Sequence, residues 1–447
     1  MNPTSRRNFL RTALLGCGGL ALRSLATGLS SEFLTERVAH AEPSGTPTFL
    51  ILATDQSGDP LNVGAPGSLA DAGLRARYDA AHPAEVRSTK LSLGGGVYDA
   101  AAPWGALPPA LLSRLGFVHH RTSAETHPEH PKVMRVFDAM RGATGNGVEM
   151  LPSAIAAELA ASLGTIQREP MVLGEERVTY ESRFVEQLSP MELKGLFGGA
   201  PGRLSGFAKL RDKTLDAVYA DVKASGTKAQ RAYLDRTVAS RAQAAELGDK
   251  LAVDLGVIPV TDPKAVSGLV DDYPLDAIDQ VLTAVTLVKY KVSPVITIHL
   301  PFGGDNHHDL DFAQESLELQ GGVRIMQLVW EKLAEAGLEG VTTFAMLNTF
   351  GRTLDTSGGR AHNSGHHVMP MFGPKIRAGV AGAPQRGAHD WEAAAFSSTT
   401  GRADGSGDVT SEKSFAAAAR TLMRACGVPA ERVDVRLPGA TVTSLLV

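Results

Sequence analysis

The sequence contains little cysteine and has no long apolar run beyond its N-terminus. Only Cys17 and Cys426 occur among the 447 residues. Cys17 lies in the N-terminal segment described below, so the remainder of the chain has no cysteine pair for a disulfide. After residue 41 no apolar stretch approaches the roughly 20 residues that a transmembrane helix needs. These absences exclude a disulfide-stapled scaffold and predict no membrane span in the mature chain.

The sequence also lacks an excess of positive charge. Lys and Arg number 44 against 48 Asp and Glu, which gives a formal net charge of -4. A mildly acidic chain has no electrostatic attraction for nucleic acid or for an anionic membrane surface, so we expect no nucleic-acid partner. The content of hydrophobic residues, 43%, allows a large core to form without disulfides.

The N-terminal segment predicts export. Residues 5–11, with the sequence SRRNFLR, match the twin-arginine pattern, and a weakly apolar stretch over 10–25 follows. Ala39-His40-Ala41 then supplies the small residues of a peptidase site. We predict a signal peptide over 1–41, carried by the twin-arginine translocase, and a mature domain over 42–447 in the periplasm or outside the cell. The alternative is an ordinary N-terminal helix.

Short apolar runs alternate with helical patterns along the mature chain. Buried strands are expected at 48–53, 115–118, 295–300 and 341–347. Amphipathic helices are expected at 276–289 and 312–336. This alternation predicts an α/β fold with three layers, in which a mostly parallel sheet has helices on both faces. The stretch at about 205–255 has helical spacing and no strand signal, and it predicts an inserted helical segment.

Histidine placement is the strongest functional signal. Of the 13 histidines, eleven lie in four loop-rich regions or in strands that lead into them, at 119, 120, 127, 130, 299, 307, 308, 362, 366, 367 and 389. Asp55 follows the first predicted strand in the same way. In a parallel sheet, the loops at the carboxyl ends of the strands build the functional site. Imidazole and carboxylate groups converging from separate loops predict a divalent metal site.

Each of these residues also has a simpler interpretation. Asp55 could cap the following turn, and His127 and His130 could bond to loop carbonyls. Residues 305–309 could form a solvated loop. His366 and His367 are adjacent, and because neighbouring side chains of an extended chain point apart, at most one of them would face a site.

The sequence has no obvious nucleophile motif. Neither the G-x-S-x-G pattern nor a Walker A loop occurs. Thr126 lies in the second histidine-rich loop and is a candidate nucleophile beside a metal ion. His299 lies within a predicted strand, so we expect it to be a core or cross-strand residue.

Two motifs resemble those of a known family. Residues 348–353, NTFGRT, and 359–362, GRAH, resemble the paired signature of the exported domain-of-unknown-function 1501 family. Gly304-Asp305-Asn306-His307 is similar to that family's Gly-rich Asp-x-His loop. The family is similar to the alkaline phosphatase-like and sulfatase-like superfamily. The resemblance therefore implies an alkaline phosphatase-like fold that cleaves phosphate or sulfate esters with a divalent metal such as zinc, calcium or manganese.

The resemblance also implies roles for individual residues. The implied metal ligands are Asp55, Asp305, His307 and His362. The clustering of polar residues after the predicted strands adds His127, His130, Asp309, His366 and His367 as further candidates. Arg352 and Arg360 would either hold the substrate anion in bidentate fashion or anchor their loop through salt bridges.

Two positions depart from the family pattern. Thr349 and Ala361 stand where the family usually has acidic residues. The loss of negative ligands weakens a cation site, because ligand charge offsets the desolvation of the ion. Two functions are therefore predicted. One is an active hydrolase of a small-molecule ester, and the other is a catalytically degenerate binding or assembly protein whose partner is another exported protein.

Overall fold

The structure is a computed structural model, and it describes residues 46–174, 176–197, 205–258, 277–300, 302, 305–355 and 359–447. The predicted signal peptide at 1–41 lies outside these ranges. Within them, no helix combines the length and the apolar character that a membrane crossing requires.

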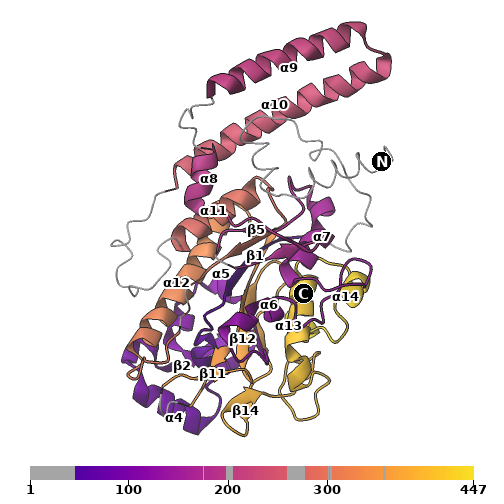
Figure 1. The fold of residues 1–447 in the computed structure, drawn as a ribbon. Helices are drawn as coiled ribbons and strands as arrows, with labels where there is room; N and C mark the ends of the chain where they lie inside the picture. Colours follow the sequence, from indigo (N-terminus) through magenta and orange to yellow (C-terminus); the bar gives the residue numbers. More distant parts are fainter. Residues whose placement is uncertain are drawn as a thin grey trace.

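A seven-stranded sheet forms the centre of the molecule (Figure 1), with the strand order β13-β4-β12-β9-β1-β8-β5. Its strands are β1 Phe49–Asp55, β4 Leu115–His120, β5 Met171–Val172, β8 Val295–Ile298, β9 Thr342–Asn348, β12 His367–Phe372 and β13 Gly379–Ala381. The pairs β1–β8, β1–β9, β5–β8 and β13–β4 are parallel, whereas β12 is antiparallel to β9 and β4. The sheet is mostly parallel, as the sequence predicts, with one strand reversed.

Both faces of this sheet are buried. Along β1, Phe49 and Ile51 belong to one core cluster, and Leu50 and Leu52 belong to the other. This two-residue alternation explains why β1 is a continuous apolar run rather than an alternating one. Helices that contribute to the first core are α4 Ala72–Ala81, α11 Ala277–Lys289 and α12 Ala313–Glu335. Helices that contribute to the second are α7 Leu151–Leu163, α13 Ser411–Ala425 and α14 Ala430–Arg436.

The predicted helical insertion is a pair of long helices. They are α9 Ser205–Ser225 and α10 Lys228–Gly256, and they follow the short helix α8 Pro190–Phe197. Figure 1 shows α9 and α10 extending away from the sheet as a hairpin. Leu251 and Leu255, near the end of α10, join the core beneath α11. The base of the hairpin is therefore attached to the body by apolar packing.

Smaller elements complete the fold. The two-stranded ribbons are β2 Ser88–Leu93 with β3 Gly96–Ala101, β6 Thr179–Tyr180 with β7 Arg183–Phe184, β10 Gly351–Arg352 with β11 His362–Asn363, and β14 Pro384–Arg386 with β15 Trp391–Ala393. The short α-helices are α3 Leu61–Gly64, α5 Pro109–Leu112 and α6 His130–Met134.

Polar residues lie together at the edge of the sheet where its parallel strands end. β1, β4 and β9 end there with Asp55, His120 and Asn348, and His299 follows β8. Because β12 runs in the opposite direction, it begins at this same edge with His367. Parallel strands bring residues that are distant in sequence to one edge, so the topology alone gathers most of the predicted site residues.

Candidate metal centre

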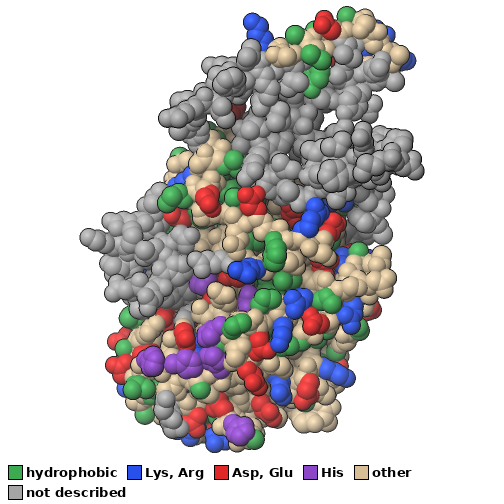
Figure 2. Space-filling view, viewed as in Figure 1, with side chains coloured by type: hydrophobic (Ala, Val, Ile, Leu, Met, Phe, Trp, Pro, Cys, Tyr) green, Lys and Arg blue, Asp and Glu red, His purple; other side chains and the backbone are tan. Residues whose placement is uncertain are grey.

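Three side chains from separate loops form a compact group at this edge. The ligand atoms of His127, Asp305 and His362 all lie within 4.8 Å of one another. His307 joins them, with its Nε2 2.9 Å from His362 Nε2 and 3.2 Å from Asp305 Oδ1. The three histidines are partly exposed, and histidine side chains form a band on the face shown in Figure 2. The structure thus brings together Asp305, His307 and His362, which the sequence predicts as ligands.

Two of the histidines are oriented by backbone carbonyls. His127 Nδ1 lies 3.1 Å from the Gln56 carbonyl oxygen, and His362 Nδ1 lies 2.6 Å from that of Glu125. A carbonyl oxygen only accepts, so each Nδ1 carries the proton and donates it. Each neutral ring then presents the lone pair of Nε2 to the group. Histidine ligands of metal ions are held in this way, with the second nitrogen bonded to a carbonyl or a carboxylate.

The contacts of His307 Nε2 conflict with one another. This atom lies 2.9 Å from His362 Nε2 and 3.3 Å from Arg352 Nη1. If it accepts a proton from Arg352, its lone pair faces the lone pair of His362. If it donates its own proton to His362, it has no lone pair left to accept the N–H of Arg352. A single ring nitrogen cannot satisfy both neighbours, whereas a cation held by both imidazoles would remove the repulsion between their lone pairs.

Burial and nearby positive charge favour the neutral form of His307 and His362. Burial and the charge of Arg352 lower the pKa of His307. Burial also lowers the pKa of His362, and Arg352 adds to that effect. The neutral ring is the form that binds a metal ion, so ligand protonation competes less with a cation than at an ordinary histidine. The carboxylate of Asp305, 3.3 Å from Arg352 Nη2, offsets the positive charge of that guanidinium.

The Phe-Gly-Arg-Thr motif supplies an aromatic support for the group. The ring of Phe350 stacks on His362 with centroids 4.1 Å apart, and it meets His127 edge-on at 5.1 Å. Gly58 lies against the same ring in a left-handed conformation, with φ 67°. Its loop, which follows β1, can approach Phe350 only because residue 58 has no side chain.

Arg352 acts as an internal brace. Its side chain is fully buried, and its Nη2 donates to the carbonyl oxygen of Ser57 at 3.0 Å and to Asp305 Oδ1 at 3.3 Å. Asn62 Oδ1 accepts a hydrogen bond from the backbone amide of Arg352 at 2.9 Å, and Asn62 Nδ2 donates one to the Arg352 carbonyl oxygen at 2.8 Å. The guanidinium therefore holds Asp305 and His307 in place, and its Nη1 and Nη2 groups already bond to the protein.

Arg360 is a loop anchor. Its Nε and Nη2 donate to Glu315 at 2.6 and 2.8 Å, and its Nη1 donates to the Thr353 carbonyl at 2.6 Å. Both side chains are almost completely buried. Of the two roles that the sequence allows for this residue, the salt bridge is the one that the structure contains.

Asp55 lies apart from the compact group. Its buried carboxylate accepts a hydrogen bond from the Ser57 amide at 2.8 Å. The carboxylate also lies 3.9 Å from His299 Nδ1, and that nitrogen is 3.6 Å from Glu176 Oε1. The group of candidate ligands found in the described part of the chain contains His127 and not Asp55. The Asp55 side chain turns toward the Ser57 amide and the β8 side of the sheet, and its role as a ligand stays a prediction. His299, expected in the core, is 19% exposed between two acids.

Two of the further candidates have structural contacts instead. His130 is buried between Thr54 Oγ1 at 3.1 Å and Thr349 Oγ1 at 2.8 Å. Burial lowers its pKa to about 4, so it is neutral near pH 7. The carboxylate of Asp309 accepts hydrogen bonds from the backbone amides of Gln314 and Glu315 in the first turn of α12.

His366 and His367 are both buried, and their neighbours differ. His366 Nε2 lies 2.9 Å from His119 Nδ1, and His119 Nε2 lies 3.0 Å from the Pro66 carbonyl. His367 Nε2 lies 3.6 Å from Asp59 Oδ1. Neither residue belongs to the compact group.

Thr126 directly precedes His127 and is exposed. Its backbone amide donates to Glu129 Oε2 at 3.2 Å, at the start of a single 3-10 turn over His127–Glu129. This turn aims His127 at the group. The role of Thr126 as a nucleophile stays a prediction.

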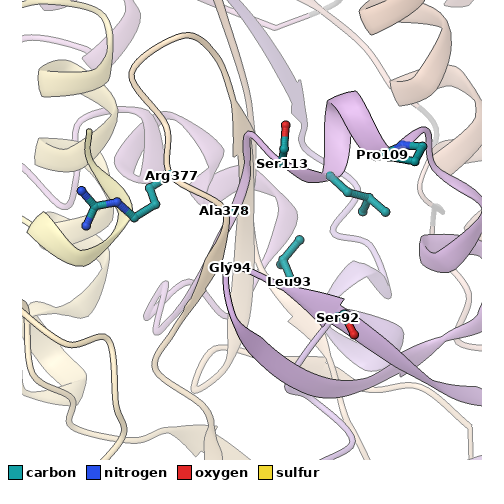
Figure 3. A pocket seen from close by; sticks show the side chains of 8 residues that line it. Ser92, Leu93, Gly94, Pro109, Ser113, Arg377 and Ala378 are labelled. Atoms are coloured by element: carbon teal, nitrogen blue, oxygen red, sulfur yellow. The ribbon is translucent and has the colours of Figure 1, made fainter.

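A pocket of about 570 Å3 lies elsewhere on the molecule. It is lined by residues that precede β4 and β13, including Ser113 and Ala378, at the opposite end of these strands from the histidines. In Figure 3 the side chain of Arg377 extends away from Ser113 and Pro109. The polar groups of this pocket do not converge, so the compact group remains the candidate site.

Sequence reasoning assigned no role to two residues that support the site, Phe350 and Glu315. Phe350 and Glu315 carry no chemical signal of their own, because an aromatic residue and an acid at the start of a helix are common in any chain.

Comparisons of this chain with protein-family models, with curated proteins and with solved structures gave no match.

Proposed function

We propose that this protein binds a divalent cation through His127, Asp305 and His362, with His307 as a fourth ligand. The observation that carries the proposal is the convergence of three ligand atoms within 4.8 Å, with both imidazoles oriented by carbonyls. A set with three nitrogens and one carboxylate suits zinc, and manganese less well. Calcium prefers six to eight oxygen ligands, so this set disfavours it.

The proposed activity is hydrolysis of a phosphate or sulfate ester on an alkaline phosphatase-like scaffold. When bound, the cation would polarise an ester oxygen and lower the pKa of a coordinated water. The partial exposure of His127 and His307, 33% and 39%, supports access for a substrate from solvent. Arg352 would keep Asp305 and His307 in place during the reaction.

A catalytically degenerate binding protein is the second candidate. The Nη1 and Nη2 groups of Arg352 and all three guanidinium nitrogens of Arg360 bond to protein groups, so a substrate anion would have to displace these bonds. The hydroxyl of Thr349, at the position of a family acid, donates to the Asp55 carbonyl at 3.1 Å. In this case the protein would bind another exported protein or a ligand without cleaving it.

One experiment separates these functions. Residues 42–447 are expressed, stripped of metal with a chelator and titrated with zinc, and bound metal is counted by elemental analysis. The same samples are assayed with generic aryl phosphate and aryl sulfate esters. We expect about one zinc ion per chain and zinc-dependent release of the aryl alcohol. Zinc binding without turnover would favour the degenerate binding protein.

Matched variants test the site itself. His362→Ala and Asp305→Asn should each remove zinc binding and activity together. His389→Ala removes an exposed histidine outside the compact group and should leave both unchanged. Equal zinc binding by His362→Ala and the wild type would refute the proposed ligand set.

Export by the twin-arginine route is a proposal of the same kind, based on residues 1–41. This route carries folded proteins, which suits a cargo loaded with metal before it crosses the membrane. Replacement of Arg6 and Arg7 by lysine should keep the full-length chain inside the cell, as cell fractionation would show.

A further inference from the structure

A buried carboxylate lies behind the candidate metal centre. Glu315 is the third residue of α12 and is 2% exposed. Its Oε1 lies 2.8 Å from Arg360 Nη2 and 2.9 Å from His82 Nε2. Its Oε2 lies 2.6 Å from Arg360 Nε and 3.4 Å from Asn306 Nδ2. Each oxygen therefore has two donors, which is close to the full accepting capacity of a carboxylate.

Two of these donors, Asn306 and Arg360, belong to the two loops that carry the ligands. Asn306 lies between Asp305 and His307, and Arg360 precedes His362 by two residues. The two loops are about 50 residues apart in sequence, and Glu315 contacts both. The backbone amide of Glu315 also donates to Asp309 Oδ2 at 2.7 Å, which attaches the end of the first loop to α12.

The charge of Glu315 is compensated on both sides. Burial raises its pKa, but Arg360 and His82 outweigh that effect and bring it down to about 2. His82 is itself fixed, because its Nδ1 lies 2.8 Å from the Tyr78 carbonyl and its ring stacks on that of Tyr78. A buried charge with this many partners is costly to move, so it holds its donors in one place.

We propose that Glu315 is the positioning residue of the metal centre, with His82 supporting it from behind. It holds the loop of Asp305 and His307 at a fixed separation from the loop of His362. This inference rests on the proposed cation site. It assigns a role to a carboxylate that touches none of the ligand side chains. It also assigns one to His82, which is the one histidine after residue 41 that stands outside the loop clusters.

The variant Glu315→Gln keeps the shape of the side chain and removes its charge. Arg360 is then left buried without its counter-ion, and its loop should shift. Loss of such supporting contacts typically lowers metal affinity by about 10- to 100-fold. Glu315→Gln should therefore weaken zinc binding by that factor while all four ligand side chains remain present.

The chain offers a matched control. Glu158 on α7 bonds to Arg432 at 2.7 Å and to Arg436 at 2.8 Å, in the layer on the other face of the sheet. Glu158→Gln also breaks a largely buried ion pair, with Arg436, so it should destabilise the fold. Because Glu158 contacts neither ligand loop, zinc affinity should be unchanged. This comparison separates positioning from general stability.

The test uses residues 42–447 as the wild type, Glu315→Gln, Glu158→Gln and the milder His82→Gln. Zinc affinity is measured by competition with a chromophoric chelator, and Co2+ replaces Zn2+ for visible absorption spectra that report ligand geometry. We expect altered cobalt spectra and weaker zinc binding for Glu315→Gln, and a smaller change in the same direction for His82→Gln. His82→Gln keeps a hydrogen-bonding group against Glu315. If Glu315→Gln does not fold, the zinc affinity of His82→Gln tests the positioning role instead.

The outcomes distinguish this inference from the function on which it rests. A wild-type chain that binds neither zinc nor cobalt overturns both proposals. A wild type that binds zinc, with the Glu315 and His82 variants binding it equally well, overturns the positioning role alone. Equal losses of affinity in Glu158→Gln and Glu315→Gln also overturn it, because the effect would then reflect stability.

Discussion

The contact between Gly58 and Phe350 provides a sharp test of how the candidate site is built. A Cβ atom added at Gly58 would lie 2.1 Å from Phe350 Cε2 and 2.4 Å from its Cδ2, and the residue has φ 67°. The variant Gly58→Ala must therefore adopt an unfavourable backbone conformation and also displace the Phe350 ring. The same ring stacks on His362 and meets His127.

The two costs can be separated. The left-handed conformation costs alanine about 1–2 kcal/mol relative to glycine. Forcing an added methyl group into a packed interior costs about 1–3 kcal/mol more. Gly95→Ala has only the conformational cost, since Gly95 has φ 84° and an added Cβ there would meet nothing within 4 Å. Gly58→Ala should therefore lower the free energy of unfolding by about 1–3 kcal/mol more than Gly95→Ala.

Urea denaturation of the two variants measures that difference, and zinc titration measures its consequence. Displacement of Phe350 should move His127 and His362, so we expect Gly58→Ala to bind zinc about tenfold or more weakly. Gly95→Ala lies in the β2–β3 turn and should bind zinc like the wild type. Equal destabilisation by both variants, or unchanged zinc affinity in Gly58→Ala, would refute the reasoning.

Three further predictions concern metal, pH and the lost acid. Zinc at 100 times its dissociation constant should add about 2.7 kcal/mol to the free energy of unfolding of the wild type and none to that of Asp305→Asn, as thermal melts would show. His130, with a pKa of about 4 when folded, takes up its proton readily only after unfolding. Stability should therefore fall between pH 6.5 and 4, by up to about 3 kcal/mol from this residue, and His130→Gln should lack that component in urea series across this range. Identical pH profiles would contradict this. Ala361→Asp should bind zinc severalfold more tightly than Ala361→Asn in calorimetric titrations, because the aspartate returns a negative charge beside His362. Equal affinities of the two variants would show that position 361 does not reach the ion.

Much of the fold was predictable because buried strands and amphipathic helices are local patterns. The runs at 48–53 and 341–347 became β1 and β9, and the stretch at 312–336 became α12. The reversal of β12 was not predictable, since the direction of a strand depends on its partners and not on its composition. The reversal brings His367, the first residue of β12, to the same edge as Asp55 and His120, the last residues of β1 and β4.

The candidate site was predictable as a group and not in its membership. The sequence by itself determined that histidines and acids would meet at one sheet edge, because strand ends with polar residues converge in any mostly parallel sheet. Only the tertiary structure decided that His127 joins Asp305 and His362 while Asp55 turns toward the Ser57 amide. It also decided that Arg360 binds Glu315. The physical reason is that a side chain's partners depend on loop geometry and long-range packing, which no pattern of neighbouring residues encodes.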